Sequence, residues 1–87
     1  MTIKIDNDTY SCETAQVNFF SDGAKTIDFS MINVSLPEIT ELMSQYTNST
    51  IIIDEEDVFN NFKFSTATKR YDKGAPHEIH VTFINAL

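Results

Sequence analysis

This chain of 87 residues contains a run of four consecutive carboxylates: Asp54, Glu55, Glu56 and Asp57. It is the densest group of side chains that could bind a metal ion or take part in acid–base chemistry. Carboxylates bind divalent cations, but an EF-hand loop needs oxygen ligands at alternating positions, a glycine at the turn and a distant glutamate. The run lacks that spacing, so we expect no metal. The acids fit a solvated turn, and they also fit an anionic face that stands in for phosphates.

A smaller group of cations, Lys69, Arg70 and Lys73, surrounds Tyr71. They could contact a phosphate or an acidic patch, but three cations are too few for a nucleic-acid footprint. Charges at a hairpin end also discourage edge-to-edge aggregation. We therefore favour a structural role and expect no direct nucleic-acid binding.

The remaining reactive side chains show no catalytic pattern. His77 and His80 lie three residues apart on a predicted strand, where they point to opposite faces and cannot share a zinc ion. Cys12 is the single cysteine, so we expect no intramolecular disulfide and an inert, buried thiol. The chain has two glycines, too few for a phosphate-binding loop, and no nucleophile motif. We expect a protein that is not an enzyme and needs no cofactor.

Charge is distributed unevenly along the chain, whose formal net charge is −7. Residues 1–57 carry eleven acids against two lysines, whereas residues 58–87 carry four basic residues against two acids. An acidic surface repels nucleic-acid phosphates and attracts basic grooves, so the charge favours docking on a cationic protein. The alternative is that the charge serves solubility alone.

Composition predicts one globular domain over residues 1–87. Hydrophobic residues make up 41 % of the chain, and the abundance of Phe, Ile and Thr over Ala favours strands. The start lacks the apolar run of a signal peptide, and no stretch approaches the roughly 18 apolar residues that cross a bilayer. We expect a cytoplasmic protein without membrane contact, in the host cytoplasm if a phage encodes it.

The elements that must position these side chains are mostly hairpins. Residues 62–69 and 79–83 alternate in period two around a turn at residues 71–76, with Phe62, Phe64, Thr66 and Thr68 expected on one face. Residues 2–5 and 9–12 form a first hairpin, and residues 15–19 and 27–31 form a second around Asp22-Gly23. The apolar parity changes after Met31, which predicts a bulge, or else the end of strand pairing, near residues 31–32.

One helix interrupts the strands. Ser35 and Glu38 have the spacing of a capping box, Pro37 suits the first turn, and apolar residues recur at helical spacing to Tyr46, which predicts about three turns. The β-branched run 50–53 that follows predicts a strand buried on both faces near the middle of the sheet.

These elements predict an α+β fold, with an antiparallel sheet of about five to seven strands in the order ββ-ββ-α-β-ββ and one short helix packed on one face. The side chains expected in its core are Ile5, Val17, Phe19, Ile27, Phe29, Leu42, Ile52, Phe62, Phe64, Val81 and Phe83.

The predicted function follows from the charge. We expect a small acidic binding protein, such as a phage-encoded inhibitor or adaptor with an anti-CRISPR-like or other anti-defence role, that docks on a basic protein of a nucleic-acid-binding complex. The alternative is a virion or tail module that self-associates through sheet edges, and a homodimer is left open. The predicted partner-binding residues combine the acidic run, an aromatic anchor after it and two helix glutamates: Asp54, Glu55, Glu56, Asp57, Phe59, Glu38 and Glu41.

Overall fold

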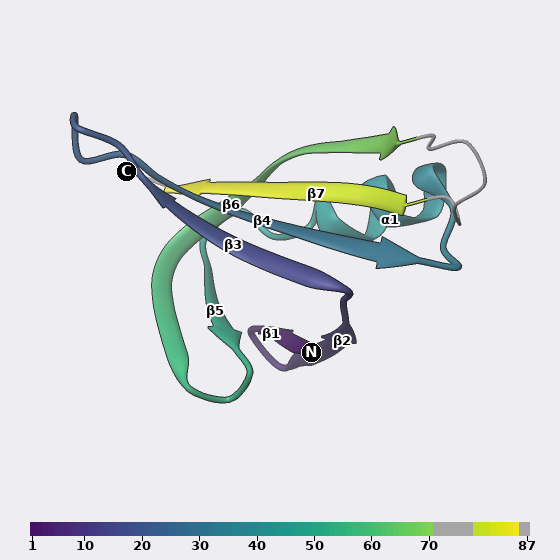
Figure 1. Ribbon diagram of the computed structural model, residues 1–87, viewed down its shortest axis with the longest axis horizontal. Coiled ribbons are helices and arrows are strands. Elements are labelled where there is room, and N and C mark those ends of the chain that lie inside the picture. The colour runs from purple at the N-terminus through teal and green to yellow at the C-terminus, as the bar shows by residue number, and fades with distance from the viewer. Residues whose placement is uncertain (71–77, 86–87) are drawn as a thin grey trace.

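A computed structural model describes residues 1–70 and 78–85 and shows the predicted α+β fold (Figure 1). Seven strands and one helix follow one another in the predicted order. Their bounds are β1 (Thr2–Ile5), β2 (Asp8–Ser11), β3 (Thr14–Phe19), β4 (Lys25–Ile32), α1 (Leu36–Met43), β5 (Ser49–Ile53), β6 (Asp57–Arg70) and β7 (Glu78–Asn85).

The strands form one antiparallel sheet in the order β2-β1-β5-β6-β7-β4-β3. The two hairpins from the first part of the chain lie at opposite edges, and β6, β5 and β7 connect them. Yet β2 and β3 are joined in sequence by only Cys12 and Glu13. The 14-residue β6 curves around the molecule (Figure 1), so the sheet encloses an inner face and presents an outer face to solvent.

The inner face holds the core. Phe83 is fully buried at its centre, and its ring centroid lies 6.0 Å from that of Phe29, 6.2 Å from that of Tyr46 and 5.9 Å from that of Phe64. Of the predicted core, the structure confirms the burial of Ile5, Ile27, Phe29, Phe62, Val81 and Phe83.

The other predicted core residues are less buried. Val17, Ile52 and Phe64 are only half-buried, and Leu42 and Phe19 are exposed. Phe19 shares the inner-face parity, but it ends an edge strand on a hairpin that projects from the molecule (Figure 1), so its ring stays largely exposed.

The predicted alternation of β6 is wrong beyond Phe64, because the strand contains a bulge. Phe64 pairs with Phe83 and Thr66 pairs with Thr82, so one extra residue lies between them. Beyond this shift Ala67 packs on the core, and the threonines at 66 and 68 turn to the outer face instead of sharing a face with Phe64.

The bulge predicted near residues 31–32 is absent, because Met31 pairs with Ile79 and Ile32 with Glu78 in unbroken register. The alternative is confirmed, since β4 and its pairing end at Ile32. The change in apolar parity has another cause. Ile32 is an apolar residue on the outer face, where it is half-buried.

The helix is shorter than predicted. Ser35 caps it, since its Oγ accepts a hydrogen bond from the backbone N–H of Glu38 at 3.3 Å, and Pro37 lies in the first turn. The helix ends at Met43, after eight residues. Ile39, Met43 and the following Tyr46 face the core, and Leu42 is turned outward, which explains its exposure. No helix of the described residues has the length and apolar character needed to cross a membrane.

Strand β5 lies beside the central strand, as predicted, but it is not buried on both faces. Ser49, Ile51 and Ile53 are buried on the inner face, whereas Thr50 and Ile52 are half-buried on the outer face. The next two strands, β6 and β7, pair as the predicted antiparallel hairpin. Its turn at 71–76, with Lys73, and also His77 lie outside the described residues.

Candidate functional site

The acidic turn, which comprises Asp54, Glu55, Glu56 and Asp57, connects β5 to β6 and is exposed throughout. Asp54 and Glu55 adopt positive φ values of 50° and 63°, a conformation that costs energy for residues with a Cβ. None of the four carboxylates forms an ion pair within residues 1–70 and 78–85. Their negative charge is therefore left for solvent or for a partner.

Asp54 has a structural role that the other three acids lack. Its Oδ1 accepts a hydrogen bond from the backbone N–H of Thr2 at 3.0 Å, and its own N–H donates to the Thr2 carbonyl at 3.0 Å. These bonds tie the start of β1 to the turn. Glu55, Glu56 and Asp57 are the acids whose side chains remain available.

Phe59 is not the exposed anchor predicted from the sequence. It pairs with Ile51 on the inner face, is half-buried, and meets Phe62 edge-on with ring centroids 6.2 Å apart. Its neighbour Val58 points to the outer face instead, where its side chain is 55 % exposed. Alternation along β6 thus presents Val58, rather than Phe59, on the outer face.

Glu38 and Glu41 are exposed on α1, as predicted, but the structure does not bring them beside the acidic turn. The chain following α1 contacts the middle of β6, where the Tyr46 carbonyl accepts from the N–H of Phe64 at 2.9 Å. The acidic turn precedes β6, and it lies away from the helix in Figure 1. The seven predicted residues therefore form two separate groups.

An outer row of side chains crosses four strands next to the acidic turn. Thr9, Lys4, Ile52 and Val58 pair in sequence from β2 to β6, which places them side by side on the outer face. Glu55 lines a shallow depression together with Lys4 and Ile52. The apolar pair Ile52–Val58, in which Val58 is exposed and Ile52 half-buried, is thus bordered by the acidic turn.

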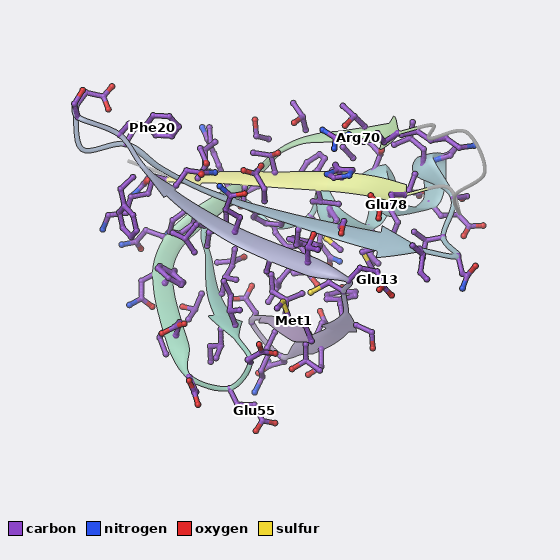
Figure 2. All side chains as sticks on the ribbon, in the orientation of Figure 1. Met1, Glu13, Phe20, Glu55, Arg70 and Glu78 are labelled. Carbon is purple, nitrogen blue, oxygen red and sulfur yellow. The ribbon has the colours of Figure 1, made fainter. Side chains whose placement is uncertain are left out.

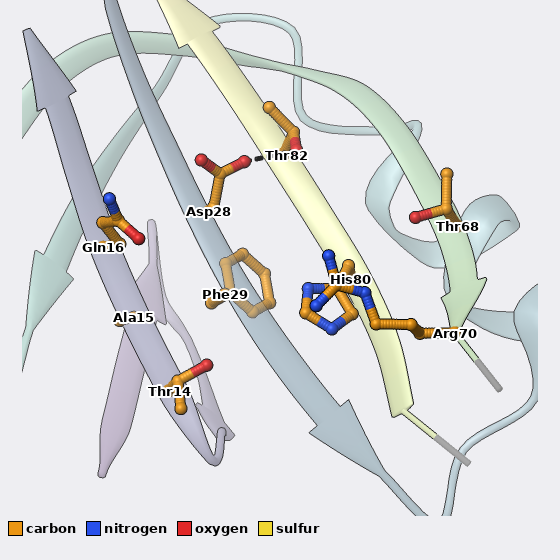
Figure 3. Close-up of a pocket in the computed structure, with 9 residues that line it drawn as sticks. All are labelled: Thr14, Ala15, Gln16, Asp28, Phe29, Thr68, Arg70, His80 and Thr82. Atoms are coloured by element: carbon orange, nitrogen blue, oxygen red, sulfur yellow. Dashed lines mark hydrogen bonds between the residues drawn. The ribbon is translucent and has the colours of Figure 1, made fainter. Parts of the chain in front are cut away.

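A second feature, the polar hollow, occupies the outer face of β3, β4, β6 and β7 (Figure 3). Its polar lining includes Gln16, Asp28, Thr68, Arg70, His80 and Thr82. Both carboxylate oxygens of Asp28 are occupied, because Thr82 donates to Oδ1 at 2.5 Å and Asn18 donates to Oδ2 at 2.7 Å. No buried polar side-chain atom of the described residues lacks a partner, so this network is satisfied internally.

The charged rim of the hollow is less constrained. His80 Nε2 lies 3.1 Å from Oε2 of Glu78, and both side chains are partly exposed. The Arg70 side chain extends across β7 toward His80 (Figure 3) and makes no hydrogen bond or ion pair within the described part of the chain. Arg70 adds a positive charge beside His80, and among the described residues no nucleophile is hydrogen-bonded to the imidazole.

The polar hollow was not predicted from the sequence. Its residues alternate with core residues on four strands, and they come together only because β4 pairs with β7 rather than with β5. The available signal was the period-two recurrence of Thr, Gln, Asn and Asp, which marks an outer face but not which strands adjoin.

Cys12 is buried, as predicted, and its burial raises the pKa of the thiol. A thiol with a raised pKa is a weak nucleophile at neutral pH. The structure thus fits an unreactive cysteine.

The described residues form no metal site, and no known protein matches the chain in the comparisons. In the ranges that the structure describes, no group of three or more His, Cys, Asp or Glu side chains could hold a metal ion. Comparisons with protein-family models, with curated proteins and with solved structures find no match.

Proposed function

We propose that the chain is a small, non-enzymatic binding protein that docks its acidic turn on a basic surface of a nucleic-acid-handling protein, as an inhibitor or an adaptor does. The observation that carries this proposal is the exposed Val58, next to the half-buried Ile52, beside carboxylates that form no ion pair with the described residues. Protein interfaces commonly combine an apolar centre with a polar rim, and this part of the outer face has both.

The charge supports the same reading. Glu55, Glu56 and Asp57 extend from a chain of net charge −7, and Figure 2 shows Glu55 at an extremity of the molecule, where little of the protein shields it. Such carboxylates steer a basic partner toward the site and mainly raise the association rate. Val58 then supplies the apolar contact that slows dissociation.

The experiment has two steps. Pull-down from a bacterial lysate, followed by mass spectrometry, supplies a candidate partner, which is then purified and its association with the chain measured by biolayer interferometry. Glu55→Lys/Glu56→Lys should slow association about tenfold at low salt, and the difference should shrink as salt reduces the Debye length to about 3 Å at 1 M.

The matched control is Glu38→Lys/Glu41→Lys, which changes the net charge by the same amount on α1. We expect it to slow association much less, because α1 lies apart from the turn. Equal slowing by the two double variants would mean that net charge alone governs binding, and it would remove the acidic turn as the docking site.

A second candidate function is a structural module that self-associates through its sheet edges, as a virion or tail component would. The uncharged edge strand β3 favours it. The mass of the purified chain in solution distinguishes the two, since a module of this kind forms open assemblies.

A further inference from the structure

Strand β3 is a free edge of the sheet without the usual protection. It pairs with β4 on one side only, and on its other side no backbone hydrogen bond forms with any described residue. Its six residues, Thr14–Phe19, include no charged residue and no proline. Free edges usually carry such residues because an unprotected edge pairs with another strand.

The side chains of β3 suit the addition of one more strand. Ala15 and Val17 are half-buried on the inner face, and Phe19 beyond them is 67 % exposed. Gln16 and Asn18 lie on the outer face, where Gln16 Nε2 donates to Asn18 Oδ1 at 2.8 Å. An added strand with apolar residues inside and amides outside would extend both faces, and β3 of a second copy has this pattern.

We propose that two copies of the chain pair antiparallel through β3, about a two-fold axis at Gln16, to form one continuous sheet. Antiparallel pairing is symmetric, so the same residues serve both copies. In this register Ala15 lies opposite Val17 of the second copy, and both side chains lie on the inner face. The dimer does not depend on docking to a basic protein.

The charges around β3 favour pairing with a second copy of the chain in this register. Glu13 directly precedes the strand and is exposed, and in this register it would lie near Phe19 of the second copy. Phe19 pairs with Lys25 within its own copy, and Lys25 Nζ lies 5.8 Å from the centroid of the Phe19 ring. Each Glu13 therefore approaches Lys25 of the other copy, and the dimer has two such opposite-charge contacts.

Sedimentation velocity of the purified chain over a concentration series to about 1 mM tests the proposal. We expect a monomer–dimer equilibrium. Gln16→Lys places two like charges at the axis and should weaken the dimer about tenfold or more. Thr9→Lys adds the same charge to β2, the other edge, and should leave the dimer intact. Thermal melting verifies that both variants fold.

A charge swap tests the register. Glu13→Lys and Lys25→Glu should each weaken the dimer, and the double variant should restore it, because opposite charges again meet. Glu55→Lys/Glu56→Lys should not affect the dimer, which separates this result from that of the docking experiment. A monomer at every concentration, a dimer insensitive to Gln16→Lys, or a double swap that restores nothing would overturn the proposal.

Discussion

The hydroxyl groups of Tyr10 and Tyr46 lie 2.6 Å apart, although 36 residues separate them in the chain. Tyr46 also donates to Oδ2 of Asp8 at 2.7 Å. These bonds connect the β1–β2 hairpin to the segment that follows α1.

The first prediction concerns this connection. Tyr46→Phe retains the buried ring but removes both hydrogen bonds, and it should lower the free energy of unfolding by about 1–2 kcal/mol in urea denaturation. Tyr10→Phe should lower the free energy of unfolding by a smaller amount, because Tyr46 still donates to Asp8. Equal losses from the two variants would contradict the central position of the Tyr46 hydroxyl.

The second prediction concerns alkaline pH. Burial, with hydrogen bonds to Tyr10 and Asp8, raises the pKa of Tyr46 above its ordinary 10.0, and burial raises that of Cys12 above 9.0. Both groups are neutral when protonated, and the folded state holds these protons more tightly than the unfolded state does. Their contribution to stability is fully present below about pH 9 and is lost as pH rises beyond it.

Urea midpoints should therefore be nearly constant from about pH 7 to 8.5 and fall above about pH 9.5. Tyr46→Phe should make that fall less steep. A midpoint that rises with pH in this range, or an equally steep fall in the variant, would show that Tyr46 does not titrate as the structure predicts.

The third prediction contrasts two phenylalanines. Phe83→Ala removes the centre of the aromatic cluster and should cost about 3–5 kcal/mol, whereas Phe19→Ala at the exposed end of β3 should change stability by about 0.5 kcal/mol or less in the monomer. Thermal or chemical unfolding at low protein concentration measures both. Similar losses would mean that Phe19 is packed rather than exposed.

The fourth prediction tests the backbone of the acidic turn. Glu55 has a φ of 63°, so Glu55→Gly should relieve strain and raise the free energy of unfolding by a few tenths to about 1 kcal/mol. The same variant should bind a basic partner more weakly. Glu56→Gly, at a position without positive φ, should not stabilise the fold, and its melting temperature provides the control.

The fifth prediction separates binding from folding at adjacent positions. Val58→Ala should weaken partner binding with little effect on stability, since the side chain is 55 % exposed. Phe59→Ala should cost about 2 kcal/mol or more of stability, because its ring packs on Phe62. The reverse assignment would restore Phe59 as the binding anchor.

Sequence patterns predicted the order and pairing of the hairpins because period-two alternation and turn residues are local signals. Gly23, at φ 88°, closes the second hairpin, and Ser35 caps the helix, both as predicted. The faces of β6 could not be predicted, because the bulge between Phe64 and Thr66 depends on the register of its partner β7.

The candidate site was predictable only in part. The exposure of the acidic turn follows from its composition, but the choice between Val58 and Phe59 depends on which face of β6 meets the core. That choice is fixed by pairing with Ile51 and Ile52. The polar hollow needed the complete strand order.

The two hairpins at opposite edges of the sheet also determine when the chain can fold. The hairpin β1–β2 has no neighbouring strand in the sheet until β5 is available, and the hairpin β3–β4 has none until β7 is available. Strand β6 must then lie between β5 and β7. During synthesis the first half of the chain thus emerges as isolated hairpins, which are at most marginally stable in water. Sequence-distant pairings such as β1 with β5 and β4 with β7 give a high contact order, so we expect folding to be slow and to finish only after the last strand has left the ribosome.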